Sequence, residues 1–224
     1  GGELEGAHHP PPDPFLRRFV IAQYGIDSPE LARVEKLLGW QELAGIGWNG
    51  RLYHRALPVR PRPGPFVERM VKLRVEMRTV EQDLAAVETR VRFNHDHLQA
   101  ARHCARRFGY IAERELLLDA IGRELGERPA ARLPAAARDS MVCAIGRLET
   151  TANALRAEFG LLWLRHNRSA GLAENLGRMA KQETMLRTLR ELARRGSLKV
   201  DNSFSGMQAL SDIPDAREPD GAPR

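Results

Sequence analysis

The sequence predicts an all-α protein, an antiparallel helical bundle that contains two long helices with a heptad pattern. Apolar residues recur at alternating spacings of four and three over two long stretches, which begin at Phe66 and Met141. No segment of any length shows the period of two that a half-buried strand requires. Short connections between successive long helices make neighbouring helices antiparallel, which gives a bundle.

The chain opens with residues 1–12, which are rich in Gly, His and Pro and are predicted to be a linker or a truncated end. A short helical segment is expected over residues 13–57. Asp13 offers a carboxylate as N-cap, and Pro14 suits the first helical position. The apolar pattern that follows predicts a helix that closes at Gly25.

A second helix is predicted to start at Ser28-Pro29, which repeats the same capping signal, and to stop at Gly39. One or two helical turns are expected between Trp40 and Leu57. Residues 58–65 hold four prolines, so we expect an extended linker there and place the main internal boundary at it.

The first heptad pattern predicts one continuous helix from Phe66 to Phe108, ended by Gly109. Asn94 falls within the apolar positions, where a polar residue commonly fixes the register of a coiled coil. The predicted core positions are Phe66, Met70, Leu73, Met77, Val80, Leu84, Val87, Val91, Asn94, Leu98, Ala101, Ala105 and Phe108.

Three further helices complete the predicted long-helix bundle of residues 66–196. A shorter helix is expected over residues 111–125, and the second heptad pattern runs from Met141 to His166. A last helix is expected over residues 172–195. Residues 197–224 are polar and rich in Pro and Gly, so we expect a mostly disordered tail.

Composition restricts the classes of partner. The 35 basic residues exceed the 29 acidic ones, but the two signs are interspersed along the predicted helices, which argues against a nucleic-acid interface. No window approaches the roughly 18 consecutive apolar residues of a membrane span, and no signal peptide opens the chain. We expect no nucleic-acid or membrane partner, a cytoplasmic location, and a fragment of a longer protein, since the chain does not begin with Met.

No metal or cofactor is expected. His95, His97, His103 and Cys104 are of ligand type, but His95 and His97 point to different sides of a helix. His95 and His103 share one stripe, which we interpret as solvent-exposed. Cys104 and Cys143 fall within helical patterns, and two buried free thiols are the expected state.

No catalytic residue is predicted either. The sequence has no Ser or Cys in a sharp glycine turn beside a His base, and no phosphate-binding loop. The carboxylates are expected on helix faces opposite the apolar stripes, where pairing with Arg is their ordinary role.

The most informative stretch is residues 159–172, which read as a corner between two helices. Phe159 and Trp163 are expected one turn apart on the buried side, Gly171 supplies a left-handed turn, and Leu172 begins the next helix. Asn167 and Arg168 can satisfy the last carbonyls of the first helix. A packed corner explains these residues without any ligand.

This stretch resembles the Leu-Trp-Leu-x-x-Asn-Arg-x-x-Gly-Leu signature of the C-terminal helical region of bacterial β-N-acetylhexosaminidases, glycoside hydrolase family 20. Residues 13–27 and 49–55 are similar to earlier parts of that region, and the resemblance spans most of residues 13–195, with about a dozen specific positions. The matching residues are Trp163, Asn167, Arg168, Gly171 and Leu172.

The resemblance implies an accessory role. In that family a (β/α)8 barrel hydrolyses terminal β-N-acetylhexosamine residues with an adjacent Asp-Glu pair, in which Glu is the general acid and the substrate acetamido group is the nucleophile. This chain has neither an Asp-Glu dipeptide nor strand–helix alternation. The barrel is therefore expected upstream of Gly1, and the matched residues are structural, at a corner that braces the barrel, makes an oligomer contact or shapes the rim of the sugar site.

Two other functions remain open from the residues alone. A helical protein-interaction or dimerisation module without enzymatic activity would use the heptad patterns to recruit a partner or a second copy. A basic helical nucleic-acid binder would show steep salt dependence, and the interspersed acids disfavour it.

Overall fold

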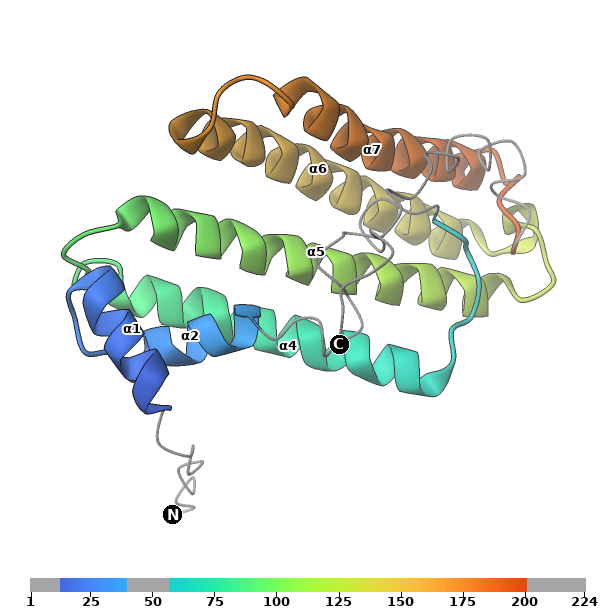
Figure 1. The fold of residues 1–224 in the computed structure, drawn as a ribbon. Helices are drawn as coiled ribbons and strands as arrows, with labels where there is room; N and C mark the ends of the chain where they lie inside the picture. Colours follow the sequence, from blue (N-terminus) through green and yellow to red (C-terminus); the bar gives the residue numbers. More distant parts are fainter. Residues whose placement is uncertain (1–12, 40–56, 201–224) are drawn as a thin grey trace, which may run out of the picture. The chain divides into compact units, whose positions relative to one another are not determined.

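A computed structural model describes residues 13–39 and 57–200, and these residues form six α-helices and one short 3-10 turn, with no strand among them (Figure 1). The all-α prediction is therefore confirmed. The helices are α1 (Pro14–Tyr24), α2 (Pro29–Gly39), α4 (Gly64–Val87), α5 (His95–Leu125), α6 (Ala135–His166) and α7 (Leu172–Arg194). Predictions for residues 1–12, 40–56 and 201–224 lie outside the described residues.

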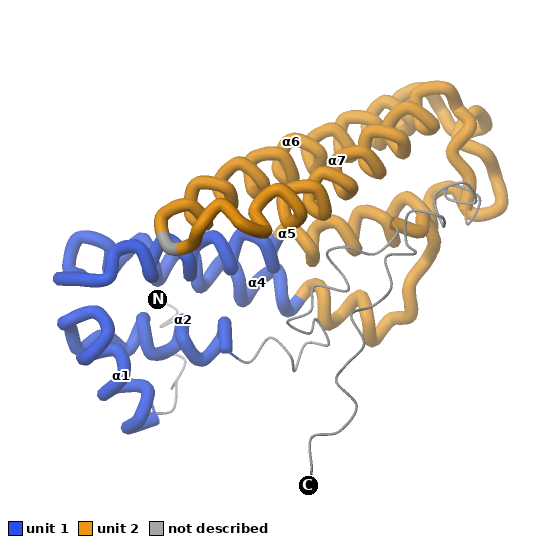
Figure 2. Tube along the Cα trace, turned by 45° about the horizontal axis from the view of Figure 1, so that its top comes forward, with its two compact units in different colours: residues 1–48, 72–109 blue, residues 49–71, 110–224 orange. Residues whose placement is uncertain are grey.

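The chain divides into two compact units (Figure 2). The described parts of unit 1 are residues 13–39 and 72–109, and those of unit 2 are residues 57–71 and 110–200. None of the described helices is both long and apolar enough to cross a membrane.

Unit 1 contains α1 and α2, which pack against each other, with parts of α4 and α5. Asp13 caps α1, since its Oδ1 accepts the N–H of Phe15 at 2.8 Å. Gly25 ends α1 with φ of 74°, as predicted. The core of the unit consists of Val20, Tyr24, Leu31, Ala32, Val34, Leu73, Met77, Val80, Leu84, Val87, Val91, Leu98, Ala101 and Ala105.

The prediction of one helix from Phe66 to Phe108 is wrong. The chain leaves the helical conformation after Val87 and re-enters it at His95, and α5 then continues past Gly109 to Leu125. Asn94 adopts φ of 57° in this turn, and its Nδ2 donates to the Gln23 carbonyl at 2.7 Å. It holds the turn against the end of α1 and does not set a coiled-coil register.

Unit 2 is dominated by the hairpin of α6 and α7, which lie side by side along most of their lengths (Figure 1). Ala130 and Ala131 donate backbone N–H groups to the carbonyls of Leu198 and Gly196, both at 2.9 Å. Helix α7 lies where it was predicted, and α6 ends at His166 as predicted but already begins at Ala135, before the first predicted heptad position at Met141. Buried apolar residues include Leu57, Val59, Tyr110, Ile111, Leu118, Ile121, Met141, Ile145, Leu148, Leu155, Met185, Leu186 and Leu189.

The proline-rich segment before α4 is packed into unit 2. Residues 57–63 are not helical, and both Leu57 and Val59 are fully buried. This segment approaches α5 so closely that a Cβ added to Gly122 would lie 2.4 Å from the carbonyl carbon of Arg60. The absence of a side chain at Gly122 therefore permits the contact.

Candidate functional site

The corner between α6 and α7 contains the five residues that the sequence resemblance singles out, Trp163, Asn167, Arg168, Gly171 and Leu172. Trp163 Nε1 donates to the Arg168 carbonyl at 2.8 Å, and the Asn167 backbone N–H donates to the Trp163 carbonyl at 2.8 Å. Gly171 has φ of 79°, and Leu172 is the first residue of α7. The predicted left-handed turn is confirmed.

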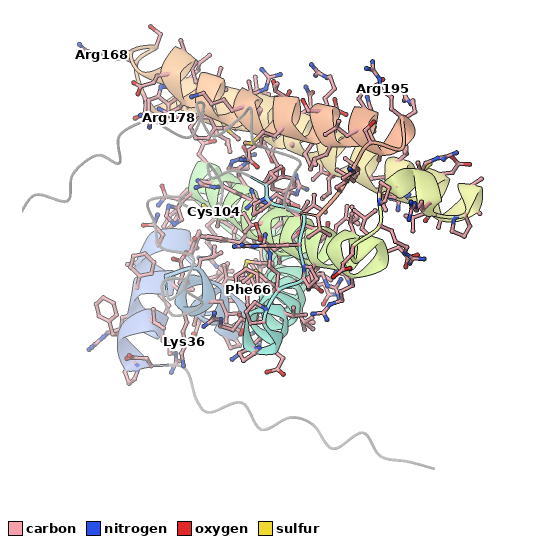
Figure 3. All side chains as sticks on the ribbon, turned by 90° about the vertical axis from the view of Figure 1, so that its right-hand side faces the viewer. Lys36, Phe66, Cys104, Arg168, Arg178 and Arg195 are labelled. Carbon is pink, nitrogen blue, oxygen red and sulfur yellow. The ribbon has the colours of Figure 1, made fainter. Side chains whose placement is uncertain are left out.

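The corner differs from its prediction in two details. Phe159 and Trp163 are only half-buried, with ring centroids 5.6 Å apart, where a place on the buried side of the helix was expected. Asn167 satisfies a last carbonyl of α6 as expected, through its backbone N–H, whereas in the bond given above Arg168 is an acceptor, since its carbonyl receives the Trp163 indole N–H. Figure 3 shows Arg168 and Arg178 near this end of the hairpin.

Two large apolar side chains beside the corner are exposed to solvent. Leu161 keeps 67% of its surface exposed and Leu164 keeps 56%. Exposed leucines on neighbouring turns of one helix are typical of a contact surface more than of a catalytic cleft.

A buried ionic network in unit 2 was missed by sequence reasoning. Arg114 and Glu115 are fully buried and lie 2.7 Å apart, and Arg62 reaches Glu115 Oε2 at 3.0 Å. Arg114 also donates to Oε1 of Gln182 on α7 at 2.7 Å. The network links α5, α7 and the segment before α4, so it fixes the packing of three separate segments.

Asp119 extends this network along α5. Its Oδ1 accepts the backbone N–H of Arg62 at 2.7 Å, and its Oδ2 accepts Nε of Arg123 at 2.9 Å. Burial alone would raise the pKa of Asp119, but these hydrogen bonds and the two nearby cations outweigh it and lower that pKa. The expectation that carboxylates lie opposite the apolar stripes is therefore wrong for Glu115 and Asp119. Arg62 and Arg114 are buried with Glu115, and Asp119 accepts the backbone N–H of Arg62.

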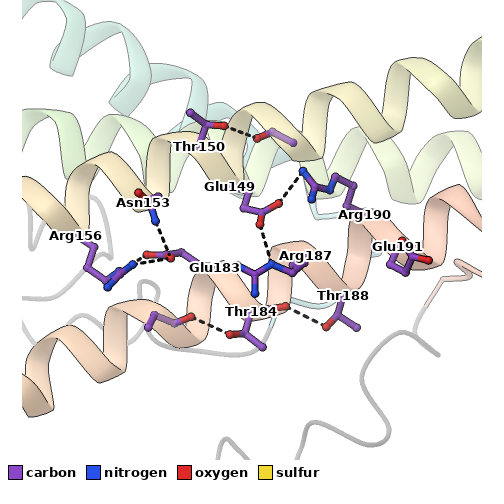
Figure 4. Close-up of polar contacts among 12 residues, drawn as sticks. Glu149, Thr150, Asn153, Arg156, Glu183, Thr184, Arg187, Thr188, Arg190 and Glu191 are labelled. Carbon is purple, nitrogen blue, oxygen red and sulfur yellow. Dashed lines mark hydrogen bonds and ion pairs between the residues drawn. The ribbon is translucent and has the colours of Figure 1, made fainter.

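A second polar layer joins α6 to α7 (Figure 4). Glu149 of α6 pairs with Arg187 at 3.1 Å and with Arg190 at 3.0 Å. The buried Glu183 of α7 accepts hydrogen bonds from Arg156 and, at 3.2 Å, from Asn153. Both carboxylates are held by side chains of the facing helix, so this layer fixes the register of the hairpin.

Unit 1 holds a smaller polar cluster around Glu35. Its Oε1 accepts the Tyr24 hydroxyl and lies 3.5 Å from Nε2 of His97. The hydrogen bond to Glu35 raises the pKa of His97. The pKa of Tyr24 is raised mainly because its hydroxyl is buried, and further because that hydroxyl donates to Glu35. Burial likewise raises the pKa of the Cys104 thiol, which disfavours the reactive thiolate.

Two predictions for the candidate ligand residues are wrong. His103 is 5% exposed and belongs to the interior, where a solvated stripe was expected. Cys143 is exposed, where a buried thiol was expected, although both cysteines are free as predicted. Among residues 13–39 and 57–200, no group of three or more His, Cys, Asp or Glu side chains is placed to hold a metal ion.

Comparison with known proteins adds no relative. No family model matches the sequence, and no curated protein or solved structure matches it either. The functional interpretation therefore depends on the residues and on the geometry described above.

Proposed function

We propose that this chain is the accessory C-terminal helical domain of a glycosidase that hydrolyses terminal β-N-acetylhexosamine residues, with the catalytic barrel outside this chain. The observation that carries the proposal is the corner of α6 and α7. Its signature residues form one ordered turn, in which the indole of Trp163 is tied to the Arg168 carbonyl. The motif is therefore used to build the fold, as expected of an accessory region.

The chemistry of the described residues is consistent with a non-catalytic role. The buried carboxylates Glu115, Asp119 and Glu183 are each engaged by arginine. For Asp119 this pairing lowers the pKa, which favours the ionised form and disfavours general acid catalysis by that group. The exposed Leu161 and Leu164 offer a surface on which another domain can pack.

An activity assay tests the proposal. The purified chain and the complete gene product that contains it are each incubated with an aryl N-acetyl-β-D-glucosaminide. We expect hydrolysis by the complete product and none by the chain alone. Turnover by the chain alone would refute the non-catalytic role, and an inactive but folded complete product would refute the link to a glycosidase.

A second candidate function is a helical interaction or dimerisation module without any enzyme attached. The specific observation that favours it is the pair of exposed leucines, Leu161 and Leu164, on neighbouring turns of α6.

A further inference from the structure

The chain that leaves α7 carries two arginines followed by an exposed serine. Arg194 is the last residue of the helix, Arg195 is its C-cap, and Gly196 takes a left-handed φ of 73°. Ser197 is exposed, and Leu198 directly after it is fully buried. The order along the chain is therefore arginine, arginine, glycine, serine and an apolar residue.

The two guanidinium groups are accessible to a partner. The side chain of Arg194 keeps 61% of its surface exposed and that of Arg195 keeps 71% (Figure 3). Both pair with Glu191, at 3.2 and 2.6 Å respectively. Exposed pairs of this kind contribute little to stability, so the carboxylates of a partner can replace Glu191 at low cost.

No other serine in the described part of the chain has this setting. Ser28 is only 2% exposed. Ser140 directly follows the acidic Asp139, and Ser169 has a single arginine, Arg168, among the three residues before it. The pair of preceding arginines is thus confined to one described serine.

We propose that Ser197 is a phosphate-acceptor site for a basophilic serine kinase, an enzyme whose substrate groove is lined with carboxylates. Such a groove is complementary in charge to consecutive arginines ahead of the target serine, and charge patterns of this kind set the specificity of kinases. The γ-phosphoryl group of ATP is transferred to Oγ of Ser197, and the bond from its phosphorus to the β-phosphate oxygen breaks. ADP leaves, and the catalytic aspartate of the kinase accepts the hydroxyl proton. The inference is independent of the glycosidase.

The surroundings of Ser197 accommodate the added charge. A phosphoserine carries a charge of about −1.5 to −2 at neutral pH. Residues 192–200 contain three cations and no carboxylate. A further cation, Arg132, lies on the 3-10 turn whose Ala131 N–H donates to the Gly196 carbonyl at 2.9 Å. Arginine can therefore provide the phosphate oxygens with charge-assisted hydrogen bonds.

The segment has to open before a kinase can hold it in an extended conformation. The N–H groups of Ser197 and Leu198 both donate to the Leu192 carbonyl, at 2.8 and 3.1 Å, and the Leu198 carbonyl accepts the Ala130 N–H at 2.9 Å. These three bonds and the burial of one leucine hold the two residues in place. Local opening of this size occurs in folded proteins without global unfolding, so the folded chain is expected to be a substrate.

Phosphorylation of the purified chain tests the proposal. The folded chain is incubated with ATP and the catalytic subunit of cyclic-AMP-dependent protein kinase, a basophilic serine kinase, and tandem mass spectrometry locates the modified residue. We expect phosphate on Ser197 of the wild-type chain and no phosphate at this position in Ser197→Ala. A folded chain that receives no phosphate on Ser197, or receives it only after unfolding in urea, would overturn the proposal.

Substitution of the arginines tests the recognition. Arg194→Gln combined with Arg195→Gln is expected to lower kcat/KM for phosphorylation by a factor of about ten or more. Arg187→Gln is the matched control, because Arg187 is 63% exposed on the same helix but lies outside the motif, and an unchanged kcat/KM is expected. Circular dichroism verifies that each variant is folded. An undiminished kcat/KM in the double variant would show that the arginines do not recruit the kinase and would overturn the proposal.

Discussion

The two units treat their charged side chains differently. In unit 2 the side chains of Arg114 and Glu115 are both fully buried, and that of Arg62 is only 6% exposed. In unit 1 the ion pair of Arg33 with Asp83 leaves 32% of the arginine side chain in water. A charge removed from water requires a partner, whereas a charge at the surface gains little from one. Pairs of arginine and carboxylate therefore fix the packing of unit 2, whereas they contribute only modestly to the stability of unit 1.

The largest expected effect is the loss of Glu115. Glu115→Ala leaves Arg62 and Arg114 buried without their shared carboxylate, so we expect a loss of about 3–5 kcal/mol in the free energy of unfolding. Urea denaturation monitored by circular dichroism measures it. Glu88→Ala is the matched control in unit 1, because Glu88 pairs with Arg102 at the surface, and a much smaller loss is expected. Equal losses for the two variants would remove the distinction between the units.

An intermediate effect is expected where the proline-rich segment contacts α5. Gly122→Ala places a methyl group 2.4 Å from the backbone of Arg60, so we expect a loss of about 1–3 kcal/mol from overpacking. Gly177→Ala is the matched control, since its added methyl group meets no atom within 4 Å, and α7 should gain up to about 1 kcal/mol. Thermal unfolding compares the stabilities of the two variants. An unchanged stability of Gly122→Ala would contradict the close packing of this segment.

The smallest expected effect is a pH dependence in unit 1. Glu35 raises the pKa of His97, so the protonated imidazole is favoured in the folded state. This contribution is fully present below the unfolded pKa of about 6.5 and is lost as the pH rises through the higher folded value. His97→Gln is therefore expected to destabilise the chain more at pH 5.5 than at pH 8.5 in urea titrations.

The control for this titration is His95→Gln, which removes an exposed imidazole from the same end of α5. The size of the His97 effect is small because 45% of that side chain is in water. If His97→Gln costs the same stability at both pH values, the pairing with Glu35 does not act as described.

The helix ends were predictable because their signals are local. Asp13 and Gly171 act on groups within a few residues of themselves, through a cap and a left-handed turn. The break after Val87 was not predictable from apolar spacing, since Val91 continues the pattern and is buried within the turn. What stabilises that break is a bond from Asn94 to Gln23, 71 positions away.

The buried network was hidden for the same reason. Arg114 and Glu115 are consecutive charged residues in a helix, which locally indicates a solvated face. Their burial depends on Arg62 and Gln182, which lie 53 residues from Glu115 and 68 residues from Arg114. At the candidate site, the turn near Trp163 could be predicted because its signals lie within the few residues of the corner itself.

The most direct test of the proposed accessory role is to read the DNA upstream of Gly1 in the same reading frame. The proposal predicts a barrel-length coding stretch with strand–helix alternation and an adjacent Asp-Glu pair. A start codon within a few residues of Gly1 would contradict it and leave a helical interaction protein.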